Sequence, residues 1–414
     1  MYKKISTKQL QPGMFIVDTG IPWLDNPYLY SAETEVSEEL VQTILNDGFL
    51  EVYIDPERGQ LQIDYEEIEV LEEPPAEPEA QPALSSLADA PEAAPAATGY
   101  PMPDIPILAE MDAARNTYVC AMEQAQTFMD GIRRNDNVDL RKAKPLVDDM
   151  LKSLGRNQDA LMSLCKLRSK DDYTYSHCVN VSVLGASFAR HMGFPPEIQH
   201  AAGMAGIFHD LGKAQVPLDI LNAPRALTEQ EFAFLRKHPR MGYEQVKKTP
   251  GFSQDILMGV YDHHERFNGQ GYPRGVSGEA ISVTGRILAI ADVYDALSSN
   301  RSYKEAIVPH RVLGIMYQMR GEDFFPGYME HFIRMLGIYP AGSVVEMQDG
   351  TVGVITGSNS TTPTKPRVLI VRDAEGFPCR PVEIDTNKPE VPAIQRCLTP
   401  EETDVDATLL LGAY

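Results

Sequence analysis

The chain has 414 residues, and its 37 Lys and Arg against 59 Asp and Glu give a formal net charge of −22. So acidic a chain is a poor general binder of DNA or RNA, because phosphate contacts need a basic face, although a small anionic ligand needs only a local cationic pocket. Five scattered cysteines without a CxxC pair argue against a disulfide framework and against a zinc ribbon. No apolar run approaches the roughly 18–20 residues of a membrane span. The N-terminus has no secretory h-region, so a cytoplasmic location is expected.

Residues 1–71 are predicted to form a small α+β domain. Short strands are expected at 13–17, 51–54 and 61–63, and a helix is expected to begin after Ser37 and end at Gly48. A linker is expected over 72–104, where the chain is rich in Pro, Ala and Glu and has no Lys or Arg. Such a composition cannot bury enough apolar surface to offset the entropy of ordering, which predicts an acidic, flexible segment.

Residues 105–169 are predicted to form connecting helices. Tyr118, Met122, Ala125 and Met129 recur at helical spacing, which indicates one apolar face. The simpler interpretation is a helix that packs on its own domain. A dimerising or signal-relaying coiled coil stays open, because three turns are too few to decide.

The remaining chain divides into a helical block, 170–340, and a C-terminal part, 341–414. The second part contains alternating or β-branched runs, GSVVEM, TVGVIT and RVLIV, with a hairpin signal at Asp349-Gly350 and an acidic tail. The predicted fold is therefore mainly α, with a helical bundle between a small α+β N-terminal domain and a short β appendage.

Histidines and carboxylates interrupt the apolar segments of the helical block. A single buried histidine is usually a core residue that is hydrogen-bonded to the backbone. A set of seven such side chains is better explained by metal coordination, since buried charge is otherwise costly. Imidazole and carboxylate together suit iron, manganese, nickel or zinc. The predicted ligands are His177, His209, Asp210, His238, His263, His264 and Asp292.

Seven ligands are too many for one ion and suit two, with Asp210 able to bridge them through its two oxygens. Pairs of ions about 3.5–4 Å apart are a known arrangement for hydrolysing phosphate esters. Lys213, Arg301 and Lys304 could then supply positive charge for phosphate oxygens.

Three motifs resemble the HD-GYP family, a branch of the HD phosphohydrolases that degrades cyclic di-GMP. They are FHDLGK, HHERFNGQGYP and RILAIADVYDAL followed by RSYK, and they occur in the family's order over about residues 170–335. The resemblance implies an HD-type helical bundle for residues 170–340. Residues 1–135 also resemble, more weakly, the uncharacterised N-terminal domain that often precedes HD-GYP, whose signal the sequence does not reveal.

The resemblance implies two sets of metal ligands. His177, His209, Asp210 and Asp292 would hold one ion, and Asp210, His238, His263 and His264 would hold the other. Iron or manganese is expected first, with nickel and zinc left open. Some members carry a carboxylate that helps to bind a third ion, where this chain has Tyr173. A phenol is a poor ligand, so two ions are expected rather than three.

The resemblance also implies a substrate site. Lys213, Arg301 and Lys304 match positions that contact the phosphates of the cyclic dinucleotide. Gly271, Tyr272 and Pro273 form the GYP loop, which either shapes the pocket wall as a rigid turn or contacts the ligand directly. Asn268 and Gly269 would help to make this turn. Asp295, one helical turn after Asp292, would orient a ligand or a substrate contact.

The function that this resemblance implies is a metal-dependent phosphodiesterase that opens cyclic di-GMP to pGpG, with further cleavage to GMP left open. A hydroxide bridging two metals, one on each side of Asp210, would attack phosphorus, and Lys213 would stabilise the developing charge. One alternative is an HD hydrolase for another nucleotide. A second is a non-catalytic receptor that binds cyclic di-GMP, or a GGDEF-type diguanylate cyclase, through the GYP face. A homodimer also stays open.

Overall fold

The computed structural model describes residues 3–18, 34–35, 41, 51–54, 104–165, 173–298, 309–399 and 402–412, except 222, 224, 226, 360, 361 and 363. The chain divides into two compact units, Met1–Ala93 and Ala94–Tyr414. The predicted strand at 61–63, most of the predicted helix up to Gly48 and nearly all of the predicted linker lie outside the described residues. Arg301 and Lys304 lie outside them as well.

The described part of the first unit is a four-stranded antiparallel sheet with the order β1-β4-β2-β3. Its elements are β1 (Lys3–Ser6), η1 (Thr7–Gln9), β2 (Phe15–Asp18), β3 (Thr34–Glu35) and β4 (Glu51–Ile54). The strands predicted at 13–17 and 51–54 are confirmed. β1 was not predicted, because its sequence KKIS offers only one apolar residue, Ile5, which is fully buried.

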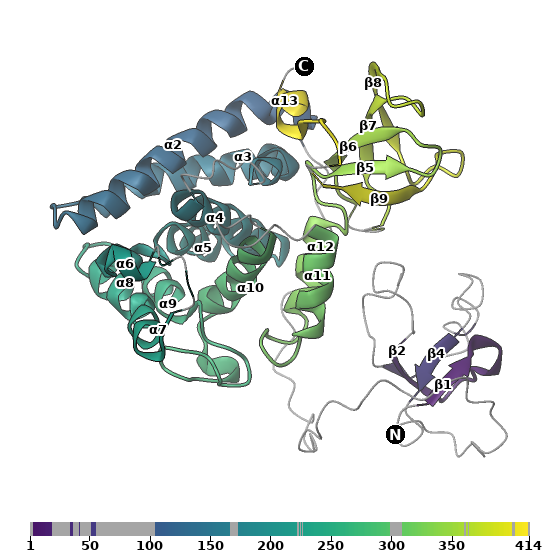
Figure 1. Ribbon diagram of the computed structural model, residues 1–414. Helices are drawn as coiled ribbons and strands as arrows, with labels where there is room; N and C mark the ends of the chain where they lie inside the picture. The colour runs from purple at the N-terminus through teal and green to yellow at the C-terminus, as the bar shows by residue number, and fades with distance from the viewer. Residues whose placement is uncertain are drawn as a thin grey trace. The chain divides into compact units, whose positions relative to one another are not determined.

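The second unit begins with a helical bundle, shown in blue, teal and green in Figure 1. Its α-helices are α2 (Ile107–Arg133), α3 (Ala143–Leu164), α4 (Tyr173–His191), α5 (Pro196–Phe208), α6 (Leu218–Leu221), α7 (Glu229–Leu235), α8 (His238–Lys247), α9 (Gln254–Asp262), α10 (Val283–Ser298), α11 (Pro309–Gln318) and α12 (Tyr328–Leu336). Short 3-10 segments are η3 (Leu140–Lys142), η4 (Leu211–Gln215) and η5 (Gly278–Ala280). Among the described residues, no helix combines the length and the apolar character that crossing a membrane requires.

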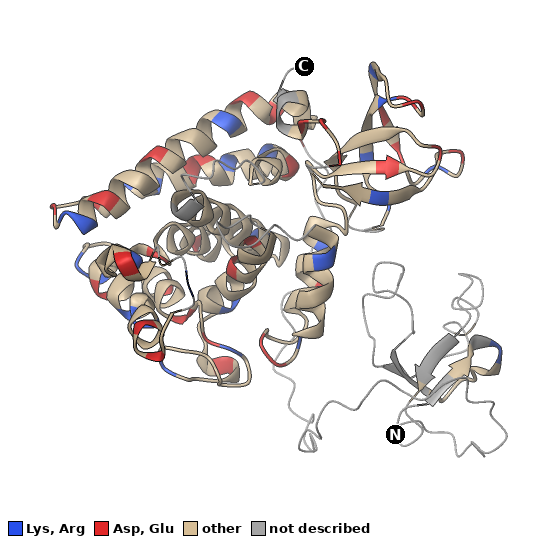
Figure 2. Ribbon diagram, in the orientation of Figure 1, with Lys and Arg blue, Asp and Glu red and all other residues tan. Residues whose placement is uncertain are grey.

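Helices α4 and α5 form the centre of this bundle, because they contact each other and also α3 and α10. Figure 2 shows few charged residues on them, whereas α2 carries acidic and basic residues along its length. Gly206 lets the two central backbones approach closely, since a Cβ at that position would lie 2.5 Å from the Cα of Ser182. The apolar, closely packed centre surrounds the polar side chains described below with a low-dielectric environment.

Helix α2 packs on its own domain, which confirms the simpler interpretation of its apolar face. Tyr118, Ala125 and Met129 are each at most 4% exposed, and α2 contacts α3, α4 and η4. Near its start, the buried carboxylate of Glu110 accepts two hydrogen bonds of 2.6 Å from the guanidinium of Arg156 on α3. This pair fixes the beginning of α2 against α3.

The C-terminal part is a five-stranded antiparallel sheet with the order β8-β7-β6-β5-β9. Its strands are β5 (Val344–Met347), β6 (Val352–Gly357), β7 (Arg367–Arg372), β8 (Pro378–Asp385) and β9 (Ile394–Leu398). The first three and the hairpin at Asp349-Gly350 match the prediction. β8 was not predicted, because it is a largely exposed edge strand that contains two prolines and so lacks a clear alternation.

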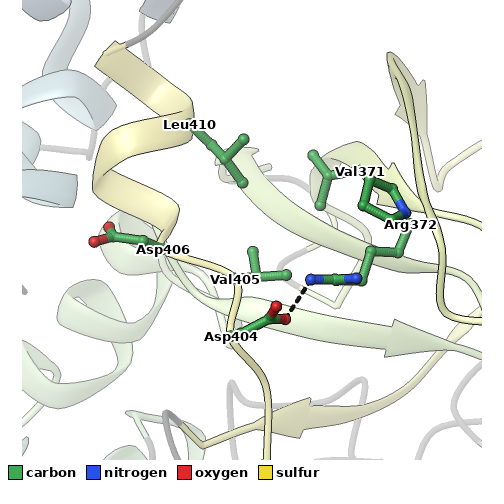
Figure 3. A pocket seen from close by; sticks show the side chains of 7 residues that line it. Val371, Arg372, Asp404, Val405, Asp406 and Leu410 are labelled. Carbon is green, nitrogen blue, oxygen red and sulfur yellow. Dashed lines mark hydrogen bonds and ion pairs between the residues drawn. The ribbon is translucent and has the colours of Figure 1, made fainter.

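The acidic tail expected after the sheet contains helix α13 (Ala407–Gly412), which was not predicted and which packs against α2. Between this segment and the sheet lies a hollow of about 270 Å³ (Figure 3). Arg372 and Asp404 form an ion pair at the hollow. The hollow is lined by Val371, Arg372, Pro378, Asp404, Val405, Asp406 and Leu410, and none of these is a predicted site residue.

A buried histidine away from the predicted site should make the stability of the bundle depend on pH. His191, at the end of α4, is 6% exposed, and its ring lies 5.9 Å from that of His331 on α12. Burial, together with the nearby His331 and Arg334, lowers the pKa of His191 from 6.5 to about 4. The unfolded chain therefore binds more protons than the folded chain between these values, so stability falls as pH drops through this window.

We expect His191→Phe to reduce this loss, because phenylalanine cannot take up a proton. At about 1.4 kcal/mol per pKa unit, the fall in free energy of unfolding between pH 7 and pH 4 should be about 3 kcal/mol smaller than in the wild type. Urea unfolding of both proteins at the two pH values measures this difference. An unchanged pH dependence in the variant would contradict the prediction.

Candidate metal centre

The seven predicted metal ligands come from distant parts of the chain and meet inside the helical bundle. His177 lies on α4 and Asp292 on α10, His238 begins α8, and the pairs His209-Asp210 and His263-His264 follow the last residues of α5 and α9. Six of the seven are at most 7% exposed, and His264 is half-buried. Polar groups buried in this way need partners, which they find in one another.

The first group of ligand atoms belongs to His177, His209 and Asp292, whose ligand atoms lie within 4.8 Å of one another. Nε2 of His177 is 3.0 Å from Oδ1 of Asp292 and 3.3 Å from Nε2 of His209. The second group belongs to His238, His263 and His264, again within 4.8 Å. In this group Nε2 of His238 is 3.2 Å from Nε2 of His263.

Asp210 lies between the two groups. Its Oδ2 is 3.5 Å from Nε2 of His209, and its Oδ1 is 3.2 Å from Nε2 of His238. Oδ1 is buried and has no hydrogen-bond partner among the described residues. One carboxylate therefore presents an oxygen to each group, as a bridging ligand requires.

The backbone orients three of the imidazoles. Nδ1 of His209, His238 and His263 lies 2.8–2.9 Å from the carbonyl oxygen three residues earlier in each case. Because a carbonyl oxygen only accepts, each Nδ1 carries the hydrogen and donates it, which turns Nε2 toward the centre of the site. Nδ1 of His177 is held instead by Oδ2 of Asp295, at 2.8 Å.

These residues fit a pair of divalent cations. Two ring nitrogens that face each other at 3.2 Å, such as those of His238 and His263, repel unless a proton or a cation lies between them. The buried Oδ1 of Asp210 lacks a hydrogen-bond partner within the described chain. The donor set of imidazole and carboxylate is also one that iron, manganese, nickel and zinc accept.

The protonation states favour the same interpretation. Burial alone would raise the pKa of Asp210, but the charges of Lys213 and His209 outweigh it and hold that pKa well below its usual value. Burial lowers the pKa of His263 well below its usual value, and burial lowers that of His264 to about 3, so both rings are neutral. Neutral imidazoles and ionised carboxylates are the forms that bind metals.

His177 is the exception. Burial would lower its pKa, but hydrogen bonds with Asp292 and Asp295 outweigh this effect and raise the pKa to about 10. Without a metal, a proton on His177 therefore supplies the positive charge between the two carboxylates. A bound cation would have to displace that proton.

Lys213 lies beside the bridging carboxylate. Its Nζ is 2.6 Å from Oδ2 of Asp210, and its side chain is 23% exposed. Gly212 makes this arrangement possible, because a Cβ there would lie 2.0 Å from the carbonyl oxygen of His238. The glycine of the HDLGK motif thus allows η4 to pass directly beside α8.

The acid that follows the two adjacent histidines has a role that the sequence did not reveal. Glu265 is 2% exposed and accepts hydrogen bonds from the backbone N–H of Arg274 and Val276, at 2.6 and 3.2 Å. The guanidinium of Arg274 in turn donates to the buried carboxylate of Asp262, at 2.8–3.0 Å. Residues 262–265 therefore supply two imidazoles that face the candidate metal centre. The two carboxylates, one before and one after the histidines, fix the following loop.

This loop carries the Gly-Tyr-Pro segment. A Cβ at Gly271 would lie 2.4 Å from the backbone nitrogen of Arg266, so the turn has no room for a side chain. Asn268 and Gly269 form the preceding turn, in which the Asn268 side chain accepts from Gln270 and Gly269 has a φ of 80°. These contacts support a rigid turn, and direct ligand contact by the loop stays a prediction.

Tyr272 is in contact with the candidate metal centre. Its ring centroid lies 4.7 Å from that of His264, and burial raises the pKa of its hydroxyl, which therefore stays protonated. The guanidinium of Arg236 stacks on Tyr272 at 5.0 Å and on Phe232 at 4.9 Å. Arg236 was not predicted from the sequence, in which the only signal is a basic residue two positions before His238.

Asp295 is 2% exposed and lies behind His177, which favours its role in orienting a ligand over a substrate contact. Tyr173 is the first residue of α4, and its side chain is not among the described ones. The prediction of two ions rather than three therefore stays a prediction.

Comparisons with known proteins agree with this site. Residues 146–326 match the HD domain, residues 2–143 match a domain of unknown function (DUF3391), and residues 344–405 match the KOW domain associated with HD domain. The chain is 32% identical over 374 residues, 89% of this chain and 85% of the relative, to the cyclic di-GMP phosphodiesterase PA4108 of Pseudomonas aeruginosa. This chain belongs to the HD-GYP phosphodiesterase family.

Two other relatives match a smaller share of the chain. The cyclic di-GMP phosphodiesterase response regulator RpfG of Xanthomonas campestris is 36% identical over 43% of this chain and 48% of its own length. The 3'3'-cGAMP-specific phosphodiesterase 1 of Vibrio cholerae is 34% identical over 38% of each chain. The HD-GYP helical bundle is thus preceded by a DUF3391 domain and followed by a five-stranded sheet of the KOW type.

Asp210 should be needed at both metal positions of this HD-GYP protein. We expect the Mn²⁺ content of protein loaded without oxygen to fall from about two ions per chain to below one in Asp210→Ala, because the bridging carboxylate is lost. Elemental analysis after gel filtration measures the content. Asp219→Ala, which removes an exposed acid on α6, is the matched control and should keep both ions. Two retained ions in Asp210→Ala would contradict the assignment.

Proposed function

We propose that this protein is a phosphodiesterase that hydrolyses cyclic di-GMP to pGpG. The observation that supports this proposal best is the convergence of buried imidazoles and carboxylates on two neighbouring positions, with Asp210 facing both. Two adjacent cation sites suit the cleavage of a phosphate ester. Chromatography that separates GMP from pGpG would also show whether pGpG is cut further.

The substrate is proposed from relatives. The Pseudomonas aeruginosa relative, of which this chain covers 85%, is named a cyclic di-GMP phosphodiesterase. A 3'3'-cGAMP-specific enzyme is related over only 38% of this chain and 38% of its own length. This second cyclic dinucleotide is the alternative substrate, and the longer match favours cyclic di-GMP.

The chain's own residues would hold the cations in two sets. His177, His209 and Asp292 would bind one ion, and the other would be bound by His238, His263 and His264, with Asp210 shared between them. Divalent iron or manganese bound there would lower the pKa of a water molecule and neutralise charge on the phosphate. Nickel and zinc also accept these ligands.

Residues beside the cations would bind and orient the substrate. Nζ of Lys213, held by Asp210, can donate its remaining hydrogens to a non-bridging phosphate oxygen and stabilise negative charge there. Tyr272 presents its ring and a protonated hydroxyl next to His264. Arg236 adds a second cation at this edge. Arg301 and Lys304, which lie outside the described residues, are proposed to contact phosphate oxygens of the substrate.

A receptor that binds the dinucleotide without cleaving it is the competing proposal. The complete set of seven ligands favours catalysis, because loss of a ligand is the simplest route to an inactive member. A diguanylate cyclase partner and a homodimer remain predictions.

Turnover distinguishes these proposals. We expect the Mn²⁺- or Fe²⁺-loaded protein to convert cyclic di-GMP to pGpG, and the variant His209→Ala with Asp210→Ala to lose at least about 1,000-fold in rate while keeping its helical circular dichroism. Chromatography of the products measures both. Tight binding with no cleavage by the wild type would favour the receptor, and cleavage of 3'3'-cGAMP alone would favour the alternative substrate.

Lys213 should act on the rate rather than on metal binding. We expect Lys213→Gln to lower kcat by about 10- to 100-fold, because a cation that stabilises the phosphate charge is lost, while two ions stay bound. Lys247→Gln, an exposed lysine that stacks on Tyr243, is the control and should keep full activity. Equal kcat values in the two variants would argue against a catalytic role for Lys213.

A further inference from the structure

A buried chain of hydrogen bonds leads from helix α2 to one of the proposed metal ligands. The hydroxyl of Tyr118 donates to Oδ1 of Asn180 at 2.7 Å. Nδ2 of Asn180 donates to Oδ1 of Asp295 at 2.8 Å. Oδ2 of Asp295 lies 2.8 Å from Nδ1 of His177. All four side chains are at most 4% exposed, so water does not compete for these bonds.

The hydroxyl of Tyr118 holds the Asn180 amide in the one orientation that satisfies all of its hydrogen-bonding groups. Nδ2 of Asn180 also donates to the carbonyl oxygen of Cys165 at 3.0 Å, so both hydrogens of the amide have acceptors. The amide oxygen then needs a donor, which is the Tyr118 hydroxyl. If the amide turned over, its oxygen would face the carboxylate of Asp295 and repel it.

The orientation of Asn180 is passed on to His177. With Oδ1 held by Asn180, Asp295 presents Oδ2 to Nδ1 of His177 and accepts its hydrogen. This bond sets the plane of the imidazole and directs Nε2 toward Asp292 and His209. Partners that hold a histidine in this way usually change metal affinity by 10- to 100-fold when they are removed.

Helix α2, which carries Tyr118, connects two parts of the chain. By sequence, α2 falls within the match to the N-terminal domain of unknown function, residues 2–143. By packing, it lies against α3, α4 and η4 of the HD-GYP bundle. A second bond joins it to α4, where the hydroxyl of Tyr175 donates to Asp130 at 3.0 Å. The helix that follows the N-terminal unit therefore contacts the element that carries His177.

We propose that Tyr118 is a positioning residue for the metal centre, which it serves from α2 by fixing Asn180, Asp295 and thereby the ring of His177. This inference rests on the proposed metal centre. It assigns Tyr118 a function beyond the packing of α2, because a residue that only packed would affect stability without affecting the affinity for a cation.

The test compares two tyrosine variants of the full-length, metal-free protein. Tyr118→Phe and Tyr175→Phe each remove one hydroxyl that bonds across α2 and α4, but only Tyr118 is connected to a metal ligand. Mn²⁺ alone is titrated in competition with a chelator, and unfolding of the metal-free proteins is recorded in parallel. We expect Tyr118→Phe to weaken the affinity for one of two ions by about 3- to 10-fold, less than a directly bonded partner would. Tyr175→Phe should leave both affinities unchanged.

Equal Mn²⁺ affinities in wild type and Tyr118→Phe, or the same loss in both tyrosine variants, would overturn the inference. Asn180→Ala breaks the same chain at its next link and should cause at least the loss seen for Tyr118→Phe, which also provides a measurement if the tyrosine variant folds poorly. Adding Tyr118→Phe to Asp295→Asn should cause no further loss, and full additivity would count against a common path. A wild type that takes up no Mn²⁺ would instead overturn the metal centre itself.

Discussion

The structure of this HD-GYP protein depends on the mutual burial of imidazoles and carboxylates. A carboxylate such as Asp210, about 1% exposed, would be strongly destabilising in an apolar bundle if it had no partner. It is held between two histidine groups and Lys213, and its remaining oxygen faces His238. The bundle therefore concentrates negative charge and ring nitrogens at one place, which a pair of cations would neutralise.

The scaffold controls this chemistry through backbone geometry. Three ligand histidines lie where their Nδ1 donates to the carbonyl three residues earlier, so the helix ends select the tautomer. Gly206 and Gly212 let neighbouring backbones approach closely enough to bring these ends together. The catalytic proposal and the inference about Tyr118 both depend on this rigidity. When an imidazole is fixed by a hydrogen bond, its position depends on the position of the group that accepts that bond.

The gathering of the candidate ligand residues could be predicted, because charged and polar side chains that interrupt apolar helices are conspicuous in sequence. Their supporting partners could not. Asn180 looks like an ordinary member of an apolar helix, and Tyr118 looks like an ordinary member of the apolar face of α2. Only the packing of α2 on α4 brings them into line with Asp295. Glu265 stands in a motif, but its role depends on a loop that returns nine and eleven residues later. The edge strand β8 and the helix α13 were missed because their sequences lack a clear period.

The most direct test of this account is the anomalous scattering of a crystal of the Mn²⁺-loaded protein. The account predicts two peaks about 3.5–4 Å apart, one beside His177, His209 and Asp292 and one beside His238, His263 and His264, with Asp210 between them. A single peak, or peaks away from these side chains, would contradict it.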